Sequence, residues 1–140
     1  YREIIEPGAF TKSLAGNREV IATVDHDIAR TFAKRSDGSL IMQEDPKGLF
    51  CSAWLPDTEL GDGIIKDVNS GLIWGCSFMA DKSIERISGN QCVLQELSLN
   101  DVCVTGDPAY KNTDVIVRTR ASRLRELLAR IRIEKIRATN

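Results

Sequence analysis

Three side chains in this sequence could together perform nucleophilic chemistry. His26 is the chain's one histidine, the residue type that most often moves a proton near neutral pH. Ser77 lies in Gly75-Cys76-Ser77-Phe78, where small neighbours would let a substrate backbone approach the hydroxyl. Glu96 lies among leucines in residues 94–99, where an inward-facing carboxylate would need a partner such as an imidazole. These types suit a nucleophile, its base and an orienting acid.

Each of these residues also has an ordinary structural explanation. Asp25 and Asp27 flank His26, so the three residues could form a solvated, charged turn. Serines are common in strands. Glu96 could lie on the wet face of an edge strand, because the apolar and polar residues alternate there with a period of two. Residue types and spacing leave both explanations open.

Composition indicates an ordinary globular domain without a metal site. Hydrophobic residues make up 42% and charged residues 28% of the 140 residues, which fits one folded domain. The four cysteines have no CxxC spacing, and one histidine is too few to complete a zinc site. We therefore expect no metal or other cofactor. Three of the cysteines lie in apolar runs, which is typical of reduced, buried thiols in the cytoplasm.

The two ends of the chain differ in charge. Residues 1–117 contain 11 Lys and Arg against 18 Asp and Glu, net −7, and residues 118–140 contain 8 against 2, net +6. No apolar stretch approaches the roughly 18 residues of a membrane span, and the first residues have no signal-peptide character. The chain does not begin with Met, which indicates a trimmed or processed chain that starts inside its domain.

Turn residues and apolar periodicity predict the elements that would position these side chains. A helical turn over 7–14 precedes a strand over 19–25, which delivers His26 at its end. The pattern then predicts a hairpin of 31–34 with 39–43, a strand over 49–55, and a helix that Asp57 or Thr58 caps and that ends before residue 71. Further strands are predicted at 72–80, 83–87 and 91–105.

These elements predict an α+β, mainly β fold. Frequent strands with short turns favour a closed or nearly closed, antiparallel-rich β-barrel of about six or seven strands, flanked by a few helices. Residues 1–118 would form the main domain. Residues 119–140 have leucines and isoleucines at helical spacing among arginines, which predicts a basic amphipathic helix that covers the domain or links it to another segment.

Five segments, residues 3–14, 24–27, 48–49, 71–78 and 96–118, together and in this order resemble the prohead proteases of tailed phages, which are related to the herpesvirus assemblin serine proteases. Residues 3–10 with Leu14 resemble the family's opening block, and residues 24–27 its histidine block. Gly48-Leu49 resembles the intervening segment and residues 71–78 the nucleophile block. The closing block is resembled by residues 96–99 and 107–110 with Thr113 and Arg118, so the likeness covers about residues 3 to 118.

The resemblance implies a serine endopeptidase that acts during capsid maturation. Ser77 would be the nucleophile, His26 the base and Glu96 the orienting acid. The implied substrates are the scaffold portion of the capsid protein, or a separate scaffold protein, and the protease itself. We expect a homo-oligomer inside assembling proheads in the bacterial host cytoplasm, with no membrane partner.

Two other functions remain possible at this point. Met79 and Ala80 stand where the family would have glycine and an aromatic residue, which would fit a noncatalytic assembly module that keeps the protease fold. The basic residues 118–140 could bind nucleic acid, but they lack interleaved aromatics and the rest of the chain is acidic. Nucleic acid is therefore the less favoured partner.

Overall fold

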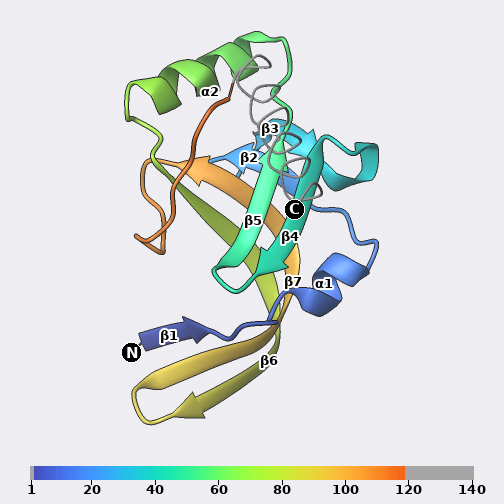
Figure 1. The fold of residues 1–140 in the computed structure, drawn as a ribbon, viewed down its shortest axis with the longest axis vertical. Helices are drawn as coiled ribbons and strands as arrows, with labels where there is room; N and C mark the ends of the chain where they lie inside the picture. The colour runs from blue at the N-terminus through green and yellow to red at the C-terminus, as the bar shows by residue number, and fades with distance from the viewer. Residues whose placement is uncertain (1, 119–140) are drawn as a thin grey trace, which may run out of the picture.

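The computed structural model describes residues 2–118, and these form a mainly β fold with two α-helices (Figure 1). The elements in chain order are β1 (Arg2–Ile5), α1 (Thr11–Ala15), β2 (Ile21–Val24), β3 (Asp27–Lys34), a 3-10 turn (Arg35–Asp37), β4 (Leu40–Asp45), β5 (Gly48–Ala53), α2 (Glu59–Asn69), β6 (Gly75–Ser88) and β7 (Gln91–Thr105). The helix predicted over 119–140 lies outside the described residues.

The long strand β7 organises a mixed sheet of five strands. Its first half pairs in parallel with β1 and its second half in parallel with β2, along the same edge. β6 pairs antiparallel along the other edge, and β3 pairs antiparallel with β2. The hairpin of β4 and β5 forms a separate two-stranded sheet. In Figure 1, β6 and β7 run together from their hairpin at the bottom of the view to the level of β2, below α2.

Residues 2–118 do not form the barrel predicted from strand frequency. β1, β3 and β6 each pair with one strand of the five-stranded sheet, and no pairing among these three closes it. The predicted pairing of 31–34 with 39–43 was also wrong, because the 3-10 turn and Gly38, at φ 78°, redirect the chain. β4 therefore leaves the sheet and pairs with β5. The strands predicted at 72–80 and 83–87 are one bulged strand, β6.

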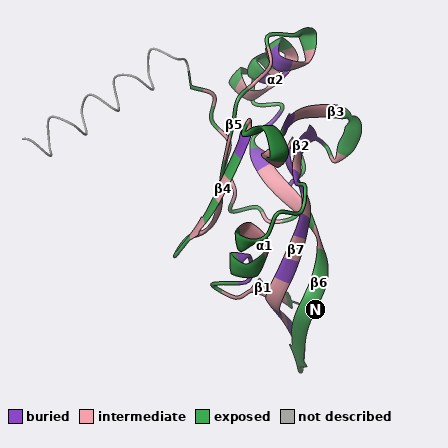
Figure 2. Ribbon diagram, turned by 90° about the vertical axis from the view of Figure 1, so that its right-hand side faces the viewer, coloured by how far each residue is buried: buried purple, intermediate pink, exposed green. Residues whose placement is uncertain are grey.

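Two apolar clusters form the core. The larger one packs one face of β7 and β2 against the opening segment and the hairpin; it contains Phe10, Val20, Ala22, Leu40, Leu94, Leu97, Leu99 and Val102. The smaller one joins Val24 to Ile64 of α2 and Ile73. Figure 2 shows the buried residues concentrated along β7, whereas β6 is largely exposed. Burial of one β7 face is what fixes the register of this strand.

Helix α2 confirms the predicted cap. Thr58 Oγ1 accepts a hydrogen bond from the Gly61 N–H at 3.4 Å, and the helix ends before Gly71, as predicted. No helix within residues 2–118 is long and apolar enough to cross a membrane.

Candidate active site

His26 lies in the tight turn that joins β2 to β3. Asp25 and His26 have φ of 54° and 59°, the left-handed values that a two-residue hairpin turn requires at both central positions. Asp and His tolerate this conformation better than β-branched residues do. The strand predicted at 19–25 therefore ends as expected, and the imidazole is placed at the end of the sheet by the turn geometry.

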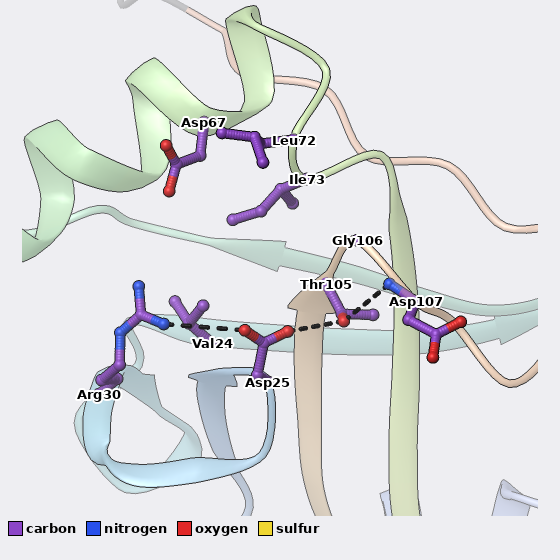
Figure 3. Close-up of a pocket in the computed structure, with 9 residues that line it drawn as sticks. All are labelled: Val24, Asp25, Arg30, Asp67, Leu72, Ile73, Thr105, Gly106 and Asp107. Carbon is purple, nitrogen blue, oxygen red and sulfur yellow. Dashed lines mark hydrogen bonds and ion pairs between the residues drawn. The ribbon is translucent and has the colours of Figure 1, made fainter.

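The side chain of Asp25 ties this turn to the end of β7. Thr105 Oγ1 donates to Asp25 Oδ1 at 2.6 Å and accepts the N–H of Asp107 at 3.1 Å (Figure 3). Arg30 Nη1 lies 3.8 Å from the other carboxylate oxygen, Oδ2. These contacts hold the residue next to His26 from both sides.

The polar residues of the site share one face of the sheet. Ser77 on β6 lies directly opposite Cys103 on β7, and Cys103 lies opposite Thr23 on β2. Residues opposite each other in neighbouring strands point to the same face, with Cβ atoms about 4.5–5.5 Å apart. Asp101 precedes Cys103 by two positions, so it also points to this face. The opposite face carries the apolar core.

A carboxylate orients the imidazole. His26 Nδ1 lies 2.7 Å from Asp101 Oδ1, and the side chains are 28% and 9% exposed. An ionised carboxylate can only accept a hydrogen bond, so Nδ1 carries the proton of the neutral ring. Nε2 is then left with its lone pair free to act as a base.

Nε2 of His26 faces Cys103, the β7 residue that lies opposite Ser77. Cys103 Sγ lies 3.4 Å from His26 Nε2, and Cys103 is only 2% exposed. Burial raises the pKa of the Cys103 thiol, so the group stays protonated near neutral pH and donates its S–H to Nε2. Within the described chain, no hydrogen bond joins the Ser77 hydroxyl to His26. The structure therefore brings His26 to the neighbour of Ser77, one side chain away from it.

Glu96 occupies a different part of β7. Its Oε1 lies 3.3 Å from Lys12 Nζ, and it lines a surface hollow together with Ser13, Ser83 and Ser98. The contact between Glu96 and His26 that the sequence predicted is absent from the hydrogen bonds of residues 2–118. Sequence reasoning missed Asp101, which takes the position on Nδ1. The available signal was a carboxylate placed directly before the apolar run of residues 102–104.

A β-bulge gives Asp101 its direction. Met79 pairs with Asp101, but the next residue, Ala80, pairs with Leu99, so Asn100 is an extra residue in β7. Leu97 and Leu99 face the core, and a regular strand would also turn residue 101 toward the core. The extra residue reverses the alternation and places Asp101 on the face of His26.

The segment after β7 packs against the start of β6. Thr113 Oγ1 accepts the Cys76 N–H at 3.0 Å and lies 3.2 Å from the carbonyl oxygens of both Cys76 and Tyr110, which share its one hydroxyl hydrogen. A Cβ built on Gly75 would lie 2.6 Å from Pro108 Cγ, so only glycine allows this approach. These contacts bring the segment after β7 next to Gly75 and Cys76, the two residues that precede Ser77.

A cavity of about 310 Å³ opens beside the histidine turn (Figure 3). Its apolar wall contains Val24, Leu72 and Ile73, and its polar wall contains Asp25, Arg30, Asp67, Thr105 and Asp107.

No group of three or more His, Cys, Asp and Glu side chains within residues 2–118 is arranged to hold a metal ion.

Comparison with known families identifies one family for this chain. The sequence profile of the Caudovirus prohead serine protease family matches residues 1–127. No curated protein and no solved structure shows a significant match to the chain. Since this match covers most of the chain, the chain belongs to the Caudovirus prohead serine protease family.

Proposed function

We propose that this chain is a serine endopeptidase in which Ser77 is the nucleophile, His26 the general base and Asp101 the residue that orients the imidazole. One observation carries the proposal. The His26 ring is hydrogen-bonded to a carboxylate through Nδ1, while Nε2 faces Cys103, the residue directly opposite Ser77. Base, orienting acid and hydroxyl thus meet on one sheet face.

The reaction begins when Ser77 Oγ attacks the carbonyl carbon of a peptide bond. The hydroxyl proton passes to His26 Nε2 as the C–O bond forms, and Asp101 stabilises the resulting imidazolium through Nδ1. Nε2 then gives the proton to the leaving amine, and the C–N bond breaks to leave an acyl ester on Ser77. A water molecule, deprotonated by Nε2, hydrolyses the ester and restores the serine.

Asp101 is better placed than Glu96 for the third role. Asp101 is nearly buried and lies 2.7 Å from the imidazole, whereas Glu96 is paired with Lys12 on another part of the same face. A carboxylate next to the ring is what fixes the tautomer with a basic Nε2. We therefore assign Asp101 to this role and give Glu96 a structural role near α1.

In this structure, His26 Nε2 is hydrogen-bonded to the thiol of Cys103. Catalysis requires the Ser77 hydroxyl to replace that S–H as the donor to Nε2. Rotation of the Ser77 and His26 side chains is sufficient in principle, because Ser77 and Cys103 are cross-strand neighbours about 5 Å apart at Cβ. The side chains of Ser77 and His26 are both partly exposed, which leaves room for this rotation.

The family supplies the proposed substrates. A prohead protease acts in capsid maturation, so we propose the scaffold portion of the capsid protein, or a separate scaffold protein, as substrate, together with the protease itself. The site of action would be the assembling prohead, where a homo-oligomer of the protease would meet its substrate at high local concentration.

A fluorophosphonate probe tests the assignment. The probe should label the wild-type chain on Ser77, and the Ser77→Ala and His26→Ala variants should lose labelling, because the first lacks the nucleophile and the second its base. Ser83→Ala is the matched control, since Ser83 lies on the same strand and its hydroxyl contacts only Ser98 among the hydrogen bonds of the described chain. Labelling of Ser77→Ala at the wild-type rate, or no labelling of wild type, would point to a noncatalytic assembly module.

A further inference from the structure

Strand β6 carries Ser77 and has one edge that no described strand covers. β6 runs for 14 residues, and its partner in the sheet is β7 alone. Most of its side chains beyond residue 80 are exposed, and Figure 2 shows β6 as a largely exposed strand beside the buried residues of β7. Unpaired edges bind extended peptides through main-chain hydrogen bonds.

The ladder shows which β6 residues direct their N–H and C=O groups outward. In an antiparallel pair, residues alternate between bonding to the partner strand and pointing away from it. Cys76 points outward, because both its N–H and its carbonyl bond to Thr113. Its partner Val104 points the opposite way and accepts the Asp25 N–H at 3.2 Å.

The same alternation applies to the next residues. Phe78 and Ala80 follow Cys76 at spacings of two and four, so their main-chain groups also point outward. Leu99, opposite Ala80, donates its N–H to Ser13 Oγ at 3.0 Å on the far side of β7, which agrees with this direction for Ala80. Phe78 and Ala80 therefore present two sets of donor and acceptor groups directly beyond Ser77, and Thr113 closes the edge at Cys76.

One side chain on the catalytic face extends along this edge. Met79 shares its face with Ser77 and is 51% exposed, although it is a large apolar residue. The aromatic ring of Phe78, in contrast, is directed to the core, where its centroid lies 5.3 Å from that of Phe10. A peptide on this edge would be recognised by β6 through its backbone and by Met79 through an apolar side chain.

The geometry points to residues 78–80 of β6 as the substrate-binding edge, where an extended peptide adds to the sheet as a further strand and passes its scissile bond in front of Ser77. This inference rests on the proposed peptidase function. It assigns the main-chain N–H and C=O groups of Phe78 and Ala80 to substrate binding and Met79 to the contact with an apolar substrate side chain.

Proline at position 80 tests the edge directly. Ala80→Pro removes an outward N–H and no hydrogen bond to β7, so the fold tolerates it as edge strands do. Cleavage sites in a random peptide library, read by mass spectrometry, supply the substrate. We expect Ala80→Pro to lower kcat/KM for the best-cleaved peptide by about tenfold or more, since a main-chain hydrogen bond to the substrate is lost and the proline ring also blocks its approach.

Two controls separate the effect from unfolding. Ile87→Pro changes a residue of β6 that lies opposite Cys92 and far from Ser77. The main-chain groups of Ile87 also point outward, because the extra residue Ser83 shifts the alternation by one position. This variant should keep kcat/KM within about threefold of wild type. Fluorophosphonate labelling, which needs no extended substrate, should be unchanged in Ala80→Pro. If the wild-type chain is not labelled, the peptidase function itself is overturned. If Ala80→Pro cleaves the peptide at the wild-type rate, only the assignment of residues 78–80 as the substrate-binding edge is overturned.

N-methylation of the peptide gives an independent result. If the substrate pairs as a strand, methyl groups on alternate backbone nitrogens should block cleavage, and methyl groups on the nitrogens between them should be tolerated. Equal tolerance at all positions, or a block without a period of two, would contradict strand addition.

Discussion

Asp101 is the residue on which the proposed catalytic geometry depends most. Its carboxylate is 9% exposed and lies 2.7 Å from His26 Nδ1. Replacing it by Asn keeps the shape but offers an N–H to the ring, which favours the wrong tautomer and leaves Nε2 protonated. We expect Asp101→Asn to lower the rate of fluorophosphonate labelling on the order of 10²- to 10⁴-fold.

Glu96→Gln is the matched change for this comparison. It removes a carboxylate from the same strand and breaks only a surface ion pair with Lys12, which is worth about 0–1 kcal/mol. Its labelling rate should stay within about threefold of wild type. The reverse order, with Glu96→Gln slow and Asp101→Asn unaffected, would return the orienting role to Glu96.

The residue scale also shows what a sequence can and cannot reveal about this site. His26 and Ser77 stand out by type and by neighbouring motif. Asp101 does not, because a bulge at Asn100 decides which face it joins, and a bulge forms from the balance of packing along two strands. A regular period of two would have left Glu96 as the reasonable choice.

At the scale of elements, local signals were read correctly where the cause is local. The end of β2 at the Asp25–His26 turn and the Thr58 cap each depend on a few neighbouring residues. The partner of β4 and the closure of the sheet depend on contacts between distant strands. Strand frequency predicts that many strands are present, but it does not determine their order.

The β2–β3 turn is the element that positions the base, and Thr105 anchors it. Thr105→Val keeps the shape of the side chain but removes the hydroxyl that donates to Asp25 at 2.6 Å and accepts from Asp107 at 3.1 Å. We expect a loss of about 1–3 kcal/mol in the free energy of unfolding, because nearby polar groups lose their partner. Urea denaturation measures this loss.

The same variant should affect the rate. Because the turn would hold His26 less firmly, fluorophosphonate labelling should slow by about tenfold, and Thr105→Ser, which keeps the hydroxyl, should restore it. A Thr105→Val chain that is destabilised but labels at the wild-type rate would show that the anchor serves the fold and not the base.

At the scale of the whole molecule, one side chain of the hairpin, Glu44, forms hydrogen bonds with the opening segment, in addition to the apolar packing of Leu40 and Met42 against the core. Glu44 on β4 accepts the N–H of Gly8 at 2.9 Å through Oε1 and the hydroxyl of Thr11 at 3.0 Å through Oε2. The Phe10 N–H lies 3.4 Å from the same Oε1. These donors belong to the first turn of α1 and the residues before it, which have no partner within so short a helix. A carboxylate from a distant strand therefore caps the opening motif.

These hydrogen bonds attach the opening segment to the β4–β5 hairpin, although the two lie far apart in the sequence. Glu44→Ala should lower the free energy of unfolding by about 2–3 kcal/mol, because it removes charge-assisted hydrogen bonds and the dipole contact at the helix start. Gln43→Ala, one residue earlier on the same strand and exposed, should change it by less than about 0.5 kcal/mol. Urea denaturation of both variants would compare them. Equal stability would mean that apolar packing of Leu40 and Met42 alone holds the hairpin against the sheet, whereas a loss confined to Glu44→Ala would show that the polar cap fixes how the two sheets join.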